Sequence, residues 1–293
     1  MARRRYEGGM PRRLLATILF GLAAMLAGRA PALADNFVSG GIERGYEIFR
    51  PNSTAGPRPT VILLHGGAST AAEMRRYTGF DLLAEAAGIV AVYPQGIADD
   101  WNDPSDGLFL IDLADHLIAN GIADRRRIYV AGLSNGGIMA LQMACAHADR
   151  IAGIAVVAAS LPVGYDCRPA RSLPVIFING TADRHVPYDG DPASTVPVME
   201  SIELFARRAG CRTRHSRILP APTPPDGTRA MLYDYGGCAP GGALESVVIE
   251  GGTHGWPGAR RDIAPASIQS PASRAVDANA QIWRFFARQP PLP

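Results

Sequence analysis

The sequence predicts one α/β domain, a doubly wound and mostly parallel sheet with helices on both faces. Two observations predict this class: short continuous apolar runs recur along the chain, and stretches with apolar residues at helical spacing separate them. Strands buried on both faces of a parallel sheet are apolar at nearly every position, and helices connect one parallel strand to the next. The 293 residues, 47% of them hydrophobic, suffice for one large core.

The expected strands are the apolar runs at residues 46–50, 60–65, 89–93, 127–131, 154–158, 175–179 and 246–250. Helices are expected between them, as in the stretch where Leu110, Leu113 and Leu117 recur at helical spacing. The segment 220–242 is rich in proline and glycine, and we expect it to be a surface excursion from the fold.

The first 34 residues have the pattern of an export signal. Arginines cluster before an apolar run of 13 residues, and the small-x-small triplet Ala32-Leu33-Ala34 follows this run. The run falls short of the ~20 residues that span a bilayer. We therefore expect a cleaved signal peptide at residues 1–34 and a catalytic domain at residues 35–293. The product is expected to be secreted or periplasmic, with no stable membrane insertion.

The charge balance excludes several function classes. The chain has 29 basic and 27 acidic residues, and every basic residue is an arginine. Residues 1–34 hold six of the arginines and one glutamate, so the rest carries 23 basic and 26 acidic residues, a net charge of −3. This balance argues against a nucleic-acid partner, and the absence of lysine excludes Schiff-base and P-loop lysine chemistry.

One pentapeptide contains a candidate nucleophile. Residues 132–136 read Gly-Leu-Ser-Asn-Gly and lie between an expected strand and a helical stretch. In the pattern G-x-S-x-G, the serine occupies a sharp turn from strand to helix, and the flanking glycines avoid clashes there. We therefore predict that Ser134 is a nucleophile. The backbone N–H of Asn135, at the start of the helix, is expected to stabilise an oxyanion.

The sequence His65-Gly66-Gly67 ends the expected strand 60–65. In α/β-hydrolases, a loop after an early strand supplies the second N–H of the oxyanion hole. We assign this N–H to Gly67, with Ala68 as the alternative. His65 precedes the serine in the chain, which is the wrong order for the base of this fold class, so we expect it to shape the loop.

The acid and the base follow the serine in the order nucleophile, acid, base. Strand 175–179 leads into Asp183 through Gly-Thr-Ala, and strand 246–250 leads into His254 through Gly-Gly-Thr. Because both strands are expected in one parallel sheet, their carboxyl ends should meet at the same edge. Asp183 and His254 are therefore the predicted acid and base.

Other titratable residues are weaker candidates. His185 is two residues from Asp183, which makes it hard for one imidazole to reach both the acid and the nucleophile. His215 lies in a polar stretch that we expect to be solvated. Asp189 and Asp191 are rival acids, but Pro187 and Gly190 mark them as turn residues.

Four cysteines lie beyond the export signal, at Cys145, Cys167, Cys211 and Cys238. An even number in an exported chain predicts two disulfides, although four cysteines allow three pairings. The chain has no C-x-x-C, and the spacings do not fit a zinc site, so no metal is expected.

In combination, these motifs resemble those of the secreted α/β-hydrolase esterases of the polyhydroxybutyrate depolymerase and feruloyl esterase type, grouped with carbohydrate esterase family 1. The resemblance runs from about residue 44 to the C-terminus through LLHGG, GLSNGGIMA, PVIFINGTADRHVPYDG, ARRAGC, IEGGTHGWPG and IWRFFARQP. It implies Ser134, Asp183 and His254 as the triad, and a Cys211–Cys238 disulfide that leaves Cys145 and Cys167 as the second pair.

Two tryptophans are predicted to bind substrate. Trp101, followed by Asn102, resembles an element near the mouth of the family's active site, and Trp256 follows the predicted base by two residues. Ordinary packing is the alternative for both.

The resemblance implies a serine esterase that works through an acyl-enzyme and needs no cofactor. The expected substrates are small or oligomeric esters, either feruloyl or acetyl esters of plant cell walls or soluble hydroxyalkanoate oligomers. Some depolymerases of this type carry a cysteine where this chain has Gly67, and no surface-adsorbing module is visible, which disfavours solid polyester. A polymer depolymerase, a secreted serine peptidase of the same fold and a catalytically silent relative are the alternatives.

Overall fold

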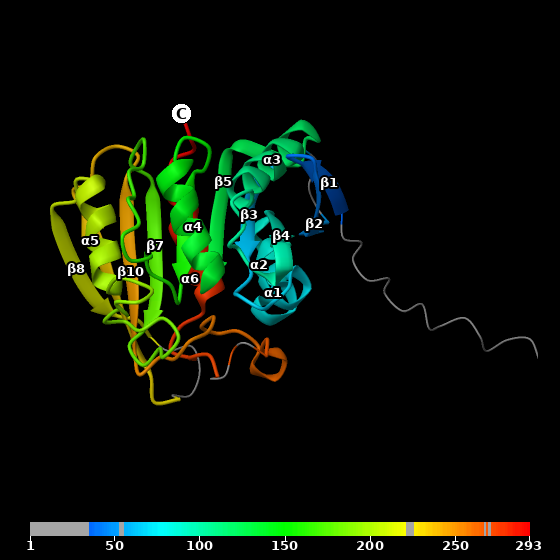
Figure 1. Cartoon of the computed structure of the whole chain (residues 1–293). Helices are drawn as coiled ribbons and strands as arrows, with labels where there is room; N and C mark the ends of the chain where they lie inside the picture. The colour runs from blue at the N-terminus through cyan, green and yellow to red at the C-terminus, as the bar shows by residue number, and fades with distance from the viewer. Residues whose placement is uncertain (1–34, 53–55, 221–225, 267, 269–270) are drawn as a thin grey trace, which may run out of the picture. The chain divides into compact units, whose positions relative to one another are not determined.

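The computed structural model describes residues 35–52, 56–220, 226–266, 268 and 271–293. The expected export signal at residues 1–34 lies outside the described residues. The described chain forms a ten-stranded sheet with the strand order β1-β2-β4-β3-β5-β6-β7-β10-β9-β8 (Figure 1). The strands are β1 (Asp35–Ser39), β2 (Ile42–Phe49), β3 (Arg58–Leu64), β4 (Val90–Pro94), β5 (Ala123–Leu133), β6 (Gly153–Val157), β7 (Pro174–Gly180), β8 (Thr213–Ile218), β9 (Arg229–Gly236) and β10 (Ala243–Glu250).

The helices are α1 (Ala71–Thr78), α2 (Phe80–Ala87), α3 (Asp106–Ala119), α4 (Asn135–Ala146), α5 (Val198–Arg208) and α6 (Ala278–Phe286), with short 3-10 turns at Ile97–Asp99 and Arg261–Ile263. The six central strands from β4 to β10 pair in parallel, and antiparallel strands flank them on both sides. This arrangement confirms the predicted doubly wound α/β class.

Helices cover both faces of the sheet and enclose two apolar layers. Phe109 of α3, Leu141 of α4 and Phe205 of α5 belong to one layer. Tyr77 of α1 and Phe285 of α6 belong to the other. The central strands are buried along nearly their whole length because both of their faces are covered.

The expected surface excursion at 220–242 is wrong in part, because residues 229–236 form β9. This strand pairs with β10 on one side and with β8 on the other. β8 is exposed at every position and has the sequence Thr-Arg-His-Ser-Arg-Ile. A search for continuous apolar runs misses it, because an edge strand with solvent on its faces does not need them. β1, at the opposite edge, is missed for the same reason.

Two disulfides hold segments that connect helices and strands of the fold. Cys145, at the end of α4, bonds Cys167, and Cys211 bonds Cys238 across the open end of the β8–β9 hairpin. This is the pairing that the family resemblance implies. It closes loops of 22 and 27 residues in sequence separation.

A buried ion pair holds β2 against the start of α3. The Arg44 guanidinium contacts the Asp106 carboxylate at 2.6 Å and lies 3.9 Å from the centre of the Phe109 ring. Burial raises the pKa of Asp106, while Arg44 and the backbone N–H of Asp103 oppose that rise. The pair fixes the loop between β4 and α3, which approaches the nucleophile candidate.

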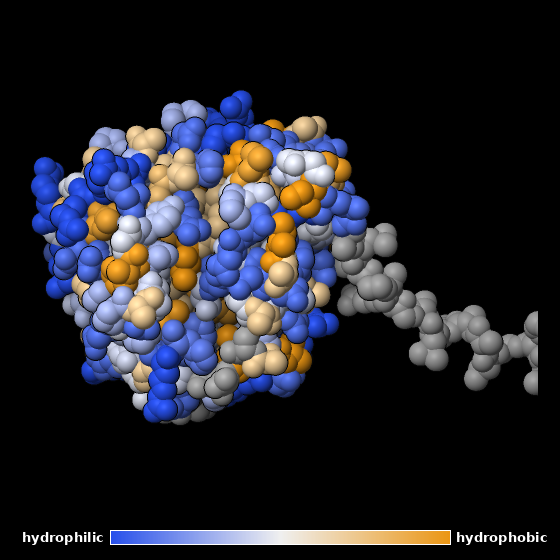
Figure 2. Space-filling model, in the orientation of Figure 1, coloured by the Kyte–Doolittle hydropathy of each residue, from blue (hydrophilic) through white to orange (hydrophobic). Residues whose placement is uncertain are grey.

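The face drawn in Figure 2 is mostly hydrophilic, with small separate apolar patches. Among the described residues, no helix combines the length and the apolarity that a membrane crossing requires.

Candidate active site

Ser134 occupies the turn between β5 and α4. Its φ of +55° lies in the left-handed region, and its backbone N–H donates to Val157 O at 2.9 Å. Residues 132 and 136 must be glycine, because a side chain at either position would collide with the backbone. A Cβ at Gly132 would lie 2.0 Å from Gly136 O, and a Cβ at Gly136 would lie 2.4 Å from His65 O. The strained serine is therefore held half-buried at the carboxyl edge of the sheet.

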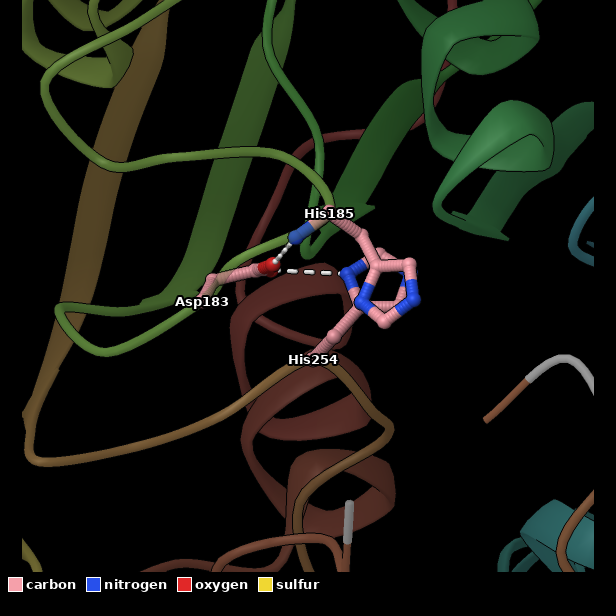
Figure 3. A group of neighbouring side chains, drawn as sticks. All are labelled: Asp183, His185 and His254. Atoms are coloured by element: carbon pink, nitrogen blue, oxygen red, sulfur yellow. Dashed lines mark hydrogen bonds and ion pairs between the residues drawn. The ribbon is translucent and has the colours of Figure 1, made fainter. Parts of the chain in front are cut away.

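Asp183 and His254 meet at the same edge, after β7 and β10 respectively. His254 Nδ1 lies 2.7 Å from Asp183 Oδ2, and the two side chains are only 4% and 1% exposed (Figure 3). The other oxygen, Asp183 Oδ1, accepts the backbone N–H groups of His185 and Val186 at 2.8 and 2.9 Å. These three hydrogen bonds hold the Asp183 carboxylate in one orientation.

The register of β7 and β10 brings the two loops together. Ile249 pairs with Gly180 at the last step of the parallel ladder. Beyond it, the backbone N–H groups of Thr181 and Ala182 donate to Ile249 O and Gly252 O at 2.9 and 2.8 Å. The acid and the base therefore sit on two loops that are hydrogen-bonded to each other.

The Asp183–His254 bond sets the chemistry of the imidazole. A carboxylate only accepts, so Nδ1 of His254 donates and Nε2 keeps its lone pair. Among the hydrogen bonds of the described residues, none joins Ser134 Oγ to this imidazole. In unliganded sites such bonds are often long and tighten only with substrate. The arrangement can accept a proton from a nearby hydroxyl.

The glycine loop after β3 lies close to the serine turn. A Cβ at Gly66 would lie 3.7 Å from Ser134 Cβ, and a Cβ at Gly67 would lie 3.7 Å from Asn135 Cβ. Among the turns, loops and caps of the described chain, neither the Gly67 nor the Asn135 N–H donates to a backbone or side-chain acceptor. They are candidate donors to an oxyanion.

His65 is fully buried, and its ring bonds to backbone on both sides. Nδ1 lies 2.8 Å from Gly66 O, and Nε2 accepts the Gly96 N–H at 3.0 Å. Burial lowers the pKa of His65, with smaller opposing effects from the Gly66 carbonyl and nearby aspartates. Neutral His65 therefore holds the glycine loop to the loop that follows β4, in line with its expected role.

The structure contradicts the substrate-binding prediction for Trp256, whereas the prediction for Trp101 stays a prediction. Trp256 is fully buried, and its Nε1 donates to Asn279 Oδ1 at 2.8 Å, so the ring has no exposed face. Trp101 is 3% exposed, and its Nε1 donates to His65 O at 2.9 Å. Trp101 also lines a cavity, so it remains a candidate substrate contact.

Asn135 contributes its side chain as well as its backbone N–H, and the sequence did not predict the contacts of this side chain. Its Oδ1 accepts the Trp101 N–H at 2.8 Å, and its Nδ2 donates to Asn102 Oδ1 at 3.2 Å. The loop after β4 is thereby tied to the residue that follows the nucleophile candidate. The adjacent Trp101-Asn102 pair was the available signal in the sequence.

A cavity of about 370 Å³ begins at this loop and follows one side of α4. More of its wall is polar than apolar, and the lining residues include Asn102, Asp103, Gln142, His147 and Tyr165. The hydrogen bond between Asn135 and Asn102 connects the cavity to the neighbourhood of Ser134.

His185 lies against the candidate base. Its exposed ring is centred 4.7 Å from the His254 ring, with 33° between the ring planes (Figure 3). Within the described part of the chain, Asp183, His185 and His254 form the group of side chains that could hold a metal, with candidate ligand atoms within 4.8 Å of one another. Sequence reasoning considered His185 only as a rival base and missed this contact.

Comparisons with known proteins agree with the fold. The chain aligns with the acetyl xylan esterase from Aspergillus awamori at a TM-score of 0.54 and 14% identity, covering 83% of this chain and 94% of that one. A putative dienelactone hydrolase from Klebsiella pneumoniae gives a TM-score of 0.55 at 17% identity, over 87% and 98% of the two chains. Residues 109–171 match the prolyl oligopeptidase family.

Sequence relatives carry esterase names. The putative esterase NocK from Nocardia uniformis is 31% identical over 85% of this chain and 82% of its own length. Feruloyl esterase D from Neurospora crassa is 24% identical over 72% of this chain and 66% of its own length. The chain covers only 32% of feruloyl esterase B from Piromyces equi, at 28% identity.

Fold, site and relatives define this protein as a serine ester hydrolase with an α/β-hydrolase fold. Within this class, the chain belongs to the esterases of the polyhydroxybutyrate depolymerase and feruloyl esterase type.

Proposed function

We propose that Ser134, Asp183 and His254 are the catalytic triad of this esterase, and that the N–H groups of Gly67 and Asn135 form its oxyanion hole. The observation that carries the proposal is the buried 2.7 Å bond between His254 Nδ1 and Asp183, at the sheet edge where Ser134 sits on its strained turn. The position of Gly67 supports the oxyanion hole, because a Cβ at Gly67 would lie 3.7 Å from the Cβ of Asn135, the residue after the serine.

The reaction follows from these roles. His254 Nε2 takes the proton of Ser134 Oγ as the oxygen bonds to the ester carbonyl carbon, and Asp183 stabilises the resulting imidazolium. The two N–H groups hold the oxyanion, and each such donor contributes about 3–4 kcal/mol in other hydrolases. The intermediate collapses, the carbon–oxygen bond to the alcohol breaks, and His254 returns the proton to the leaving alcohol.

Water completes the cycle. It attacks the acyl-enzyme carbonyl while His254 accepts one of its protons, and that proton returns to Ser134 Oγ as the acid leaves. The net reaction converts an ester and water into a carboxylic acid and an alcohol. None of these steps calls for a cofactor.

The proposed substrates are feruloyl or acetyl esters of plant cell-wall sugars, with soluble hydroxyalkanoate oligomers as the second class. The polar cavity beside Asn102 supports the sugar esters, since amide and carboxylate side chains such as those of Gln142 and Asp103 bond to hydroxyl groups. The names of the relatives, which include feruloyl and acetylxylan esterases and poly(3-hydroxyalkanoate) depolymerase, span both classes.

One hydrolysis panel tests this function. It compares methyl ferulate, acetylated xylan, p-nitrophenyl butyrate, hydroxybutyrate oligomers and a peptide amide, with Ser134→Ala as the blank. We expect ester cleavage, most efficient on the sugar esters, and a loss of about 10⁴-fold or more in Ser134→Ala. Substantial activity in that variant would remove Ser134 from its role. Faster cleavage of the amide would favour the peptidase alternative, which the partial match to the prolyl oligopeptidase family supports.

We also propose that the chain is exported from the cytoplasm, with residues 1–34 removed. The two disulfides, Cys145–Cys167 and Cys211–Cys238, support export because such bonds persist in oxidising compartments. N-terminal sequencing of protein recovered outside the cytoplasm of the producing cells should start at Asp35. Recovery of the full chain in the cytoplasm, with its thiols reduced, would contradict export.

A further inference from the structure

We propose that His185 and His254 form a binding site for a zinc-class divalent cation, and that a cation bound there reversibly blocks ester hydrolysis. The inhibitory effect rests on the proposed role of His254 as the base, whereas binding of the cation does not depend on that role.

The two imidazoles are close enough to share one cation. Their centres are 4.7 Å apart, and candidate ligand atoms of the group lie within 4.8 Å of one another (Figure 3). A tetrahedral zinc ion with bonds of about 2.0–2.1 Å holds its nitrogen ligands roughly 3.3 Å apart. The exposed His185 ring can close this difference by turning about its side-chain bonds, while buried His254 stays in place.

His254 is already arranged as a metal ligand. Asp183 bonds to its Nδ1 at 2.7 Å, so the other ring nitrogen, Nε2, is not engaged by this carboxylate. In zinc sites, a carboxylate on the far nitrogen of a histidine orients the ring and makes it a better ligand. A general base and a metal ligand both require a neutral imidazole with an available lone pair. The Asp183–His254 pair is therefore suited to either role.

The donor set selects the class of cation. Two imidazole nitrogens suit zinc and copper, whereas magnesium and calcium prefer sets of oxygen ligands. A bound zinc-class ion would occupy the His254 lone pair that takes the Ser134 proton, so the serine would not be activated. The inhibition breaks no covalent bond and is reversed by a chelator.

The first test is inhibition. Hydrolysis of p-nitrophenyl butyrate by chelator-treated, dialysed protein is measured against increasing zinc chloride, with magnesium chloride in parallel, and each protein is compared with its own metal-free rate. Zinc should inhibit, magnesium should not, and EDTA should restore the rate. His185→Gln should raise the zinc concentration for half-inhibition by about 10-fold or more. His215→Gln, the same change on exposed β8, should keep the wild-type value.

The second test measures binding without activity. Zinc chloride is titrated calorimetrically into Ser134→Ala protein and into Ser134→Ala/His185→Gln protein. We expect binding to the first and at least about 10-fold weaker binding to the second. Equal binding by both proteins, or none by the first, overturns the site. If Ser134→Ala instead keeps its esterase activity, the proposed nucleophile fails, and the titration still decides the zinc site.

Discussion

Single residues set the geometry of the candidate active site. Asp183 accepts three hydrogen bonds, two from backbone N–H groups of its own loop and one from His254. This pattern separates it from its neighbour Asp189, which is exposed on the same segment. The bond to His254 spans 71 residues of sequence, so no local pattern reports it.

The two aspartates should therefore respond differently to the same change. Asp183→Asn replaces an acceptor with an amide and removes the charge that stabilises the His254 imidazolium, so kcat should fall by about 10³–10⁴-fold. Asp189→Asn is the matched control and should stay within a few-fold of wild type. Steady-state kinetics on p-nitrophenyl butyrate measures both. Equal losses in the two variants would contradict the assignment of the acid.

At the scale of elements, the loops after β7 and β10 carry the candidate acid and base, and the hairpin of β8 and β9 extends the sheet beyond them. The Cys211–Cys238 bond closes this hairpin at its open end, next to β10. The Cys145–Cys167 bond ties the end of α4 to the segment that follows β6. The two bonds span similar lengths of chain but differ in burial.

Removing each disulfide in turn distinguishes two contributions to the free energy of unfolding, the entropy of the unfolded chain and the packing of the cysteines. The loops of 27 and 22 residues give nearly equal entropic contributions of about 3 kcal/mol each. Cys145 and Cys167 are also buried, so replacing both with alanine should lower the free energy of unfolding more than replacing Cys211 and Cys238. Urea unfolding of the two double variants measures the difference. If the variant without Cys211 and Cys238 lost more unfolding free energy, burial of the cysteines would not explain the difference between the two disulfides.

At the scale of the whole molecule, buried His65 links folding stability to pH. Its ring holds the glycine loop to the loop after β4 through Gly66 and Gly96, and it does so as a neutral imidazole. Burial lowers its pKa in the folded protein below the ordinary 6.5. The unfolded chain therefore binds this proton at a higher pH than the folded chain does.

The sign of the effect follows from this difference. As pH falls from 6.5 toward the lowered pKa, protonation favours the unfolded chain, and the free energy of unfolding should decrease. The total loss is about 1.4 kcal/mol for each unit by which the pKa is lowered, and no further loss from His65 occurs below that pKa. His65→Asn should show a shallower decline over the same range. Parallel curves for both proteins would exclude His65 as the source.

The sequence alone determined the order of the parallel strands along the chain and the serine turn. Both depend on short-range patterns, since strands buried on both faces are continuous apolar runs, and a strand-to-helix turn at Ser134 leaves room only for glycine at residues 132 and 136. The predicted α/β class, esterase family and ester hydrolysis are accordingly confirmed. The residue roles in catalysis stay predictions.

Only the tertiary structure decided what depends on contacts between distant residues. It showed that exposed β8 belongs to the sheet, that Trp256 is buried, and that His185 lies against His254. An edge strand has no continuous apolar run, and a tryptophan has the same sequence signal in a core as at a binding site. Local patterns define elements and turns, whereas the packing of the whole chain defines which faces and side chains remain available to a ligand.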